Sequence, residues 1–217
     1  SDLPEQLLAR ANQALATLSS YRARLVEEAD NLTMLEVRDQ VQVRDVAAVA
    51  QRVEMWRRID AEVRGYVSAL GVEGRLVQLQ RNELSLGVED LGRLLTEDYR
   101  PDSVAPGEFS LSGLQKLPWE DLLDVAKVAG AIDLDPVEHP LDAPMQPRGH
   151  RQLASITDLS SRAIQAIIDH FSNLQTLVSA STSELGDVKG VGLKRAREIR
   201  QGLESIFEND QRTHHFH

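Results

Sequence analysis

The stretch LGDVKGVGLKRAREI, from Leu185 to Ile199, decides how the C-terminal part of this chain folds. Apolar residues occupy its first, fourth, seventh and fifteenth positions, and two glycines flank Val191. Gly190 predicts a sharp turn with a positive φ angle after a short helix. Gly192 is predicted to let another backbone come close, because glycine has no Cβ. Val191 is predicted to point back into the turn, and a second helix is predicted to begin near Leu193.

A second stretch repeats this pattern 32 residues earlier. LASITDLSSRAIQAI begins at Leu153 and has apolar residues at the same four positions. Asp158 and Ser160 stand where the later copy has its glycines, and Ile164 stands where it has Ala196. The repeat predicts two related helical hairpins.

The later copy has the features of a phosphate-binding site. A helix that starts after a glycine turn presents unpaired backbone N–H groups and the positive end of its dipole. Such contacts hold the DNA backbone without reading bases, so binding would be independent of sequence and sensitive to salt. A tight turn with no ligand and a solvated basic face is the simpler alternative for an isolated GVG. The residues predicted to bind DNA are Lys189, Gly190, Val191, Gly192, Leu193, Lys194, Arg195, Arg197 and Arg200.

The earlier copy is a weaker candidate, because the carboxylate of Asp158 would repel phosphate. Structural pseudo-symmetry explains this copy as well as DNA contact does. Its possible hydrogen-bond donors are Thr157, Ser160, Ser161 and Arg162.

Charge is unevenly distributed along the chain. The net charge is -10, but from Met145 onward nine Lys and Arg face eight acids, which leaves -11 on residues 1–144. Five of those nine bases lie between Lys189 and Arg200, so the overall charge conceals a basic patch. The acidic front part should repel DNA.

The composition favours an all-α protein, since aromatic residues make up only 4% and aliphatic helix formers dominate. Apolar residues recur at helical spacing over 7–25, 46–70 and, less regularly, 76–95, where a bend or break is predicted at Gly87 and Gly92. One short helix is predicted from Pro118, followed by a proline-rich connector. We therefore expect a helical spine over 1–100, a short helix and connector over 101–146, tandem hairpins over 147–208 and a tail over 209–217.

Other residues are weaker functional candidates. The chain has no cysteine, which excludes disulfides and thiolate metal sites and suits a reducing cytoplasm. It has no signal-peptide pattern and no run of about 18 apolar residues, so we expect a soluble protein that does not enter the membrane.

Trp56 and Tyr66 are expected in the core. The histidines lack metal-ligand spacing, so no metal is assigned; they are His139, His150, His170 and the terminal His214, His215 and His217.

The later hairpin resembles the helix-hairpin-helix motif at every position of that pattern. The front part carries a more specific resemblance. LLARANQALATLSSYRARL from Leu7, VRDVAAVAQRVEMWRRI from Val43, LGVEGRLVQLQRNEL from Leu70 and EDYRP are similar to the helical region of the DNA integrity scanning protein family, DisA. QPRGHRQLASI resembles the start of that family's C-terminal hairpin domain. The resemblance extends from about Leu7 to Ile206.

The resemblance implies a bacterial DNA-damage checkpoint protein. Family members make cyclic di-AMP from two ATP molecules with a divalent metal, as octamers, and branched DNA lowers that output. The cyclase motifs do not occur here, so the chain is expected to be a C-terminal fragment that is not itself an enzyme and has no cofactor. No catalytic residue can be assigned. The expected partner is branched or junction DNA in the bacterial cytoplasm, at the nucleoid.

Two other functions stay open. The spine could be the working part, as an oligomerisation or partner-docking module with the hairpins as a structural cap. An accessory domain of a nuclease or glycosylase is a third reading, which no placement of carboxylates supports.

Overall fold

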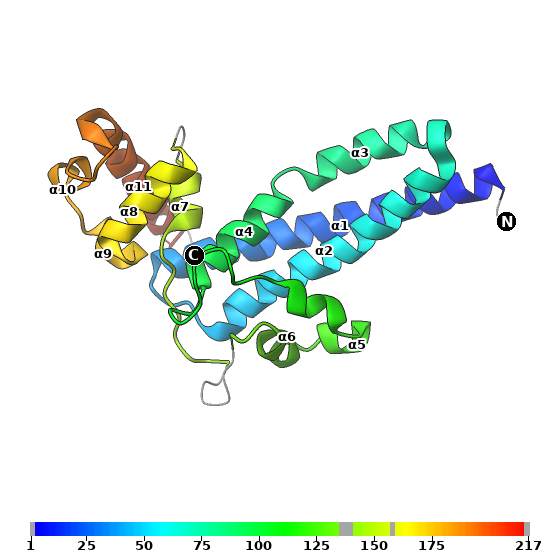
Figure 1. Cartoon of the computed structure of the whole chain (residues 1–217), viewed down its shortest axis with the longest axis horizontal. Coiled ribbons are helices and arrows are strands. Elements are labelled where there is room, and N and C mark those ends of the chain that lie inside the picture. Colours follow the sequence, from blue (N-terminus) through cyan, green and yellow to red (C-terminus); the bar gives the residue numbers. More distant parts are fainter. Residues whose placement is uncertain (1–2, 135–140, 157–158, 215–217) are drawn as a thin grey trace.

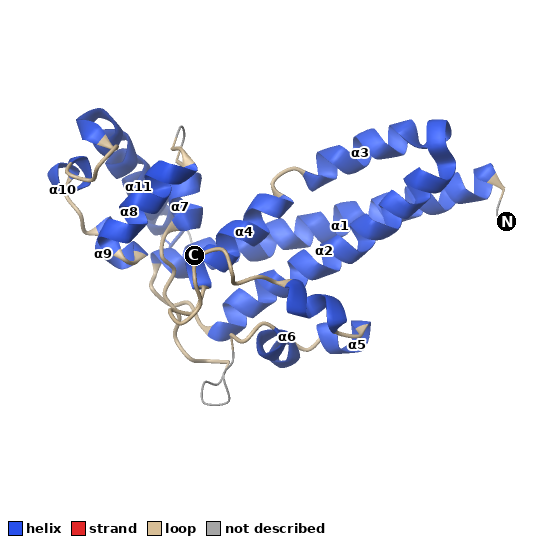
Figure 2. Cartoon of the chain, in the orientation of Figure 1, coloured by secondary structure: helices blue, strands red, loops and turns tan. Residues whose placement is uncertain are grey.

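The computed structural model describes residues 3–134, 141–156 and 159–214. The described residues form an all-α structure, in which the only β pairing is an isolated antiparallel bridge between Gln42 and Pro144. Long helices make an extended spine, and the C-terminal helices gather at the end of the spine opposite the N-terminus (Figures 1 and 2). The all-α fold and the long helical spine predicted from the sequence are confirmed.

Two long helices form the backbone of the spine. Helix α1 spans Pro4–Val37 and α2 spans Val43–Leu70, and they run antiparallel (Figure 1). At 1.5 Å per residue, α1 is about 50 Å long. Their apolar stripes meet in one core that contains Leu18, Leu25 and Leu32 of α1 and Val49, Trp56 and Val63 of α2. Trp56 is 4% exposed, so the predicted core role is confirmed for it, and Tyr66 packs against the same core partly buried.

The third predicted helix is broken, as its glycines indicated. A short 3-10 turn at Gly71–Gly74 leads into α3 at Arg75–Ser85, and α4 follows at Val88–Tyr99. Gly87 separates the two with a φ of +82°, a left-handed conformation that favours glycine. Gly92, the other position where a bend or break was predicted, lies inside α4, so the helix is interrupted at only one of the two glycines.

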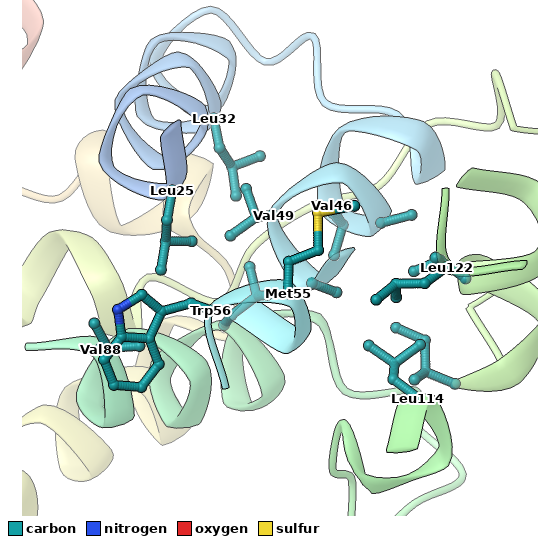
Figure 3. Packing of buried hydrophobic residues seen from close by; sticks show 14 of the residues in the cluster. Leu25, Leu32, Val46, Val49, Met55, Trp56, Val88, Leu114 and Leu122 are labelled. Carbon is teal, nitrogen blue, oxygen red and sulfur yellow. The ribbon is translucent and has the colours of Figure 1, made fainter. Parts of the chain in front are cut away.

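The segment after α4 packs against the spine. A 3-10 turn at Ser112–Lys116 is followed by α5 at Trp119–Leu122 and α6 at Val125–Ala131. The prediction of a single helix here was wrong. Helix α5 ends at Leu122, and Asp124 caps the start of α6, where its carboxylate accepts a hydrogen bond from the Ala126 N–H at 2.9 Å. In Figure 3, Leu114 and Leu122 lie on one side of α2, whereas Leu25 and Leu32 of α1 lie on the other. Helix α2 is therefore buried on two sides.

The described end of the proline-rich stretch is extended and attached to the turn between α1 and α2. The N–H of Val43 donates to the Ala143 carbonyl at 3.0 Å, and the N–H of Met145 donates to the Val41 carbonyl at 2.9 Å. This pairing leads the chain to the end of the spine where the short helices begin.

The described residues after this stretch form α7 (His150–Ala154), α8 (Ser161–Phe171), α9 (Leu174–Val178), α10 (Thr182–Gly186) and α11 (Gly192–His214). They enclose a second cluster of buried apolar residues, which runs from Leu153 to Leu203, whereas the first cluster runs from Ala11 to Leu134. The predicted domain boundaries stay predictions, but the boundary near Pro147 falls between these two clusters. Within the described residues, none of the helices combines the length and the apolar character needed to cross a bilayer.

Candidate nucleic-acid interface

The later hairpin is formed by α10, a five-residue turn and α11. The N–H of Val188 donates to the Leu185 carbonyl at 3.2 Å, and the N–H of Val191 donates to the Val188 carbonyl at 3.1 Å. Gly190 then has a φ of +88°, as the sequence predicted, and α11 begins at Gly192. The backbone N–H groups of the first turn of α11 thus follow directly on the glycine turn.

Gly192 serves a different purpose from the one predicted. A Cβ built on Gly192 meets no atom within 4 Å, so no neighbouring backbone of the described chain requires the glycine. Its φ is +71°, and that conformation is costly for any residue with a Cβ. Both glycines are therefore needed for backbone geometry, and both face open space.

The apolar residues of the motif are buried and anchor the hairpin to the apolar cluster of the hairpin region. Val191 is 4% exposed, so the prediction that it points back into the hairpin is confirmed. The remaining apolar positions of the motif are also buried, namely Leu185, Val188, Ala196 and Ile199. The turn and the first turn of α11 are thus fixed before any ligand arrives, which lowers the entropy cost of binding.

Four basic side chains lie exposed around this turn, and we call them the hairpin patch: Lys189, Lys194, Arg195 and Arg197. Leu193 is 54% exposed beside them. All of the later hairpin's predicted DNA contacts except Val191 and Arg200 are therefore on the surface.

Arg200 is engaged within the hairpin region. Its guanidinium donates hydrogen bonds to the carbonyls of Val178 and Ala180 and pairs with Glu204 at 3.1 Å. These bonds satisfy carbonyl groups at the end of α9. Arg200 therefore has a structural role through these hydrogen bonds. Contact between Arg200 and DNA stays a prediction.

The earlier hairpin is formed by α7 and α8 and has the same apolar register. Leu153, Ile156 and Ile167 are buried, and Leu159 packs partly buried against them. Ser160 is the N-cap of α8, where its hydroxyl accepts a hydrogen bond from the Ala163 N–H at 3.1 Å. This hydroxyl thus takes up one of the backbone N–H donors of the first turn of α8.

Two exposed residues remain as possible contacts in this copy. Ser161 and Arg162 lie on the surface at the first turn of α8. Thr157, the other predicted donor, and Asp158, the predicted repulsive residue, lie outside the described residues.

Of the histidines whose side chains the structure describes, His150 is buried and His170 is exposed. His150 is 6% exposed, and burial lowers its pKa to about 4. His170 lies edge-on against the ring of Phe171, with 4.7 Å between ring centres. In the part of the chain that the structure describes, no group of three His, Asp or Glu could hold a metal ion. His139, His215 and His217 are outside that part, and the side chain of His214 is not described.

Sequence reasoning missed a buried polar group where the spine meets the hairpins. Its carboxylates are Glu36 and Asp98, both 0% exposed, and its cation is Arg151. A signal was present, because each acid continues an apolar stripe: Glu36 follows Leu32 by four residues, and Asp98 follows Leu95 by three. A carboxylate in a buried register indicates a partner from elsewhere in the chain.

The fold and the turn geometry define a class: an all-α protein with a long helical spine that ends in a pair of helical hairpins. A family model described as the linker region of the DisA bacterial checkpoint controller matches residues 2–139. The chain belongs to this family, which confirms the resemblance found in the sequence.

Similar proteins carry the name DNA integrity scanning protein DisA. The one from Cutibacterium acnes is 85% identical over 212 residues, which cover 98% of this chain and 62% of that protein. Those from Acidothermus cellulolyticus and Streptomyces coelicolor are 46% and 44% identical, and the matches cover 57% and 55% of their lengths. The chain thus spans about three-fifths of the length of these relatives.

Proposed function

We propose that this chain binds the phosphate backbone of branched DNA through its later hairpin, as the regulatory part of a checkpoint protein. The observation that carries the proposal is the hairpin patch around Gly190 and Gly192, placed at the N-terminal end of α11. A phosphate oxygen there would receive backbone N–H groups and the positive end of the helix dipole, while lysine and arginine supply long-range attraction. The names of the relatives support DNA as the partner.

Binding through these groups would not read bases, since nothing in such a site reaches base edges in a defined way. Preference for junctions would then come from the shape of the branched duplex and from how many phosphates it brings to both hairpins. The acidic spine would keep DNA at the hairpin end.

In the whole protein, we propose that this binding regulates a diadenylate cyclase that makes cyclic di-AMP from ATP. ATP and a divalent metal would belong to that cyclase region, and the chain described here would add recognition and not catalysis. The protein would act as a homo-oligomer in the bacterial cytoplasm, close to the nucleoid.

A fluorescence-anisotropy titration tests the DNA proposal. A labelled four-way junction and a linear duplex of the same length are titrated at about 50 and 200 mM salt. We expect tighter binding to the junction and strong weakening at the higher salt. The variant Lys194→Glu/Arg197→Glu should lose most of this affinity, and its salt dependence should fall by about one unit of log–log slope per lost phosphate contact.

The matched control is Lys116→Glu, which reverses one exposed lysine in the 3-10 turn Ser112–Lys116, outside both hairpins. It should bind as the parent chain does. Equal, weak binding by the parent and the double variant would disprove the proposal.

An alternative function is oligomerisation or partner docking through the spine. It is favoured by one observation: four apolar side chains along α3 and the turns beside it are 61–72% exposed, namely Val72, Leu76, Leu79 and Leu86. Patches of this kind on soluble proteins often mark interaction sites. Under this alternative, Leu79→Lys would abolish self-association or partner capture, and the hairpin patch could be reversed without effect.

A further inference from the structure

The spine and the hairpin region have separate apolar cores, and charged groups connect them. The buried cluster of the spine ends at Leu134 and that of the hairpin region begins at Leu153, and no residue belongs to both. At their junction, Arg151 of α7 lies between Glu36 of α1 and Asp98 of α4. We call these three residues the joint.

Asp98 holds the start of α7. Its carboxylate accepts hydrogen bonds from the N–H groups of Gly149 at 2.9 Å, of Arg151 at 3.1 Å, and of His150. These are donors that a helix leaves unpaired at its N-terminus. A residue of the spine thus caps the first helix of the hairpin region.

Glu36 and its neighbours hold the side chain of Arg151. One guanidinium nitrogen donates to the Glu36 carboxylate at 2.7 Å. The other donates to the carbonyl of Ala29 at 3.0 Å and to the hydroxyl of Thr33 at 2.9 Å. Arg151 therefore spans two turns of α1, a geometry that the planar guanidinium fits and an ammonium group does not.

Neutral donors complete the site around Glu36. The Tyr99 hydroxyl donates to its carboxylate at 2.6 Å and the Gln152 amide at 3.0 Å. Burial raises the pKa of Glu36, and burial followed by the charge of Glu36 raises that of Asp98 to about 7. Loss of the Arg151 charge would leave two buried carboxylates without their common cation, which is strongly unfavourable.

The apolar packing around the joint is incomplete. A cleft of about 640 Å³ opens on one side, between Glu97 of α4 and Gln165 of α8. A second cleft of about 340 Å³ opens between Thr33 of α1 and Ile206 of α11. A polar contact flanked by clefts resembles the interfaces between domains that can move relative to each other.

We propose that Arg151, Glu36 and Asp98 are positioning residues that hold the hairpin region in one orientation on the spine. Without the joint, each core stays folded while the hairpin region takes many orientations. The joint acts as a unit because its two carboxylates are fully buried, the Arg151 side chain is only 9% exposed, and each member depends on the others. This proposal concerns the position of the hairpins, so it stands whether or not they bind DNA.

Distances between two spin labels test it. The chain has no cysteine, so Ala61→Cys on α2 and Gln201→Cys on α11 introduce the only labelling sites, and both positions are exposed. We expect one narrow distance distribution in the labelled parent. Arg151→Met should broaden it by roughly twofold or more, as for domains joined by a loose interface. Arg151→Lys should give a distribution of intermediate width, because lysine keeps the positive charge but lacks the planar guanidinium that donates from two nitrogens.

The matched control is Arg24→Met, which removes an arginine of α1 from an exposed pair with Glu27 and should leave the distribution narrow. Far-UV circular dichroism shows whether the helices persist. If Arg151→Met does not fold, Gln152→Leu removes one neutral hydrogen bond to Glu36 and should still broaden the distribution.

Narrow distributions in folded Arg151→Met or Gln152→Leu would overturn the proposal. So would broadening that occurs only together with loss of helix, since the joint would then be part of a single core. DNA binding is measured separately on the same variants. Failure of the parent to bind a junction would count against the proposed function and not against the joint.

Discussion

Gly202 of α11 lies directly against Ile156, two residues past the end of α7, and a Cβ on Gly202 would come within 2.7 Å of the Ile156 Cγ1 atom. The earlier and later hairpins therefore pack against each other at a point where one of them has no side chain. Ile156 belongs to the first hairpin's apolar register and is 8% exposed. The close approach explains a glycine in the middle of a 23-residue helix.

Gly202→Ala should destabilise the hairpin region. Alanine favours a helix by about 1 kcal/mol over glycine, but overpacking a core costs about 1–3 kcal/mol, and β-branched Ile156 cannot turn away freely. We expect a net loss of about 1 kcal/mol in urea unfolding. Gly65→Ala in α2 is the control, because its Cβ meets nothing within 4 Å and the change should be stabilising.

Gly190→Ala should destabilise the later hairpin by about 1–2 kcal/mol, the cost of a left-handed conformation for a residue with a Cβ. The space around Gly190 is open, so the loss would be conformational and not steric. Gly190→Asn should cost less, because asparagine tolerates positive φ. Thermal unfolding of both variants checks the order; equal losses would contradict this account.

Two buried groups near the joint should give opposite pH dependence of stability. The pKa of Asp98 is raised from 3.8 to about 7, so the folded state binds the extra proton and loses stability as pH rises across that window. The pKa of His150 is lowered from 6.5 to about 4, so protonation of the unfolded state makes stability rise with pH across that window. In the parent, the two effects largely cancel from about pH 4 to 6.5.

Single substitutions should separate these effects. Asp98→Asn should leave a stability that rises with pH up to about 6.5, and His150→Phe should leave one that falls toward pH 7. Glu36, Arg148 and Arg151 also face this site and stay in both variants, so the comparison isolates one group at a time. Urea unfolding midpoints between about pH 4.5 and 7 are the measurement, and parallel curves for both variants would refute the assignment.

Arg81→Met should loosen α3. Arg81 donates two hydrogen bonds to Asp60 at 2.6 and 2.9 Å, and Asp60 is 2% exposed. Removing one partner of a buried pair costs about 3 kcal/mol, although Arg64, at 3.2 Å from Asp60, offsets part of it. In Arg81→Met, we expect amide hydrogen exchange to be faster than in the parent chain within α3 and unchanged elsewhere. Arg93→Met breaks an exposed pair with Asp90 and should change stability by about 0.5 kcal/mol or less.

Sequence patterns predicted local structure well where the signal itself is local. The apolar spacing of α1 and α2, the break at Gly87 and the turn at Gly190 all depend on residues within a few positions of one another. The prediction of one helix after Pro118 failed because the Asp124 cap competes with a continuous apolar face, and spacing alone does not rank the two. The purpose of Gly192 was also misread, since the absence of neighbours around it is a property of the folded chain.

By itself, the sequence determined the long helices, their buried faces, the repeated apolar pattern of the two hairpins and the glycine turn of the later one, because side-chain periodicity and backbone freedom act over one or two turns. Only the tertiary structure decided which charged groups meet solvent and which hold the protein together. Arg151 reaches a carboxylate 115 positions away, and Arg200 turns toward carbonyl groups at the end of α9. Lys194 and Arg197 are also basic residues of α11, a few positions before Arg200, but they stay on the surface. The difference arises because burial of a charge is favourable only where distant segments bring a partner to it.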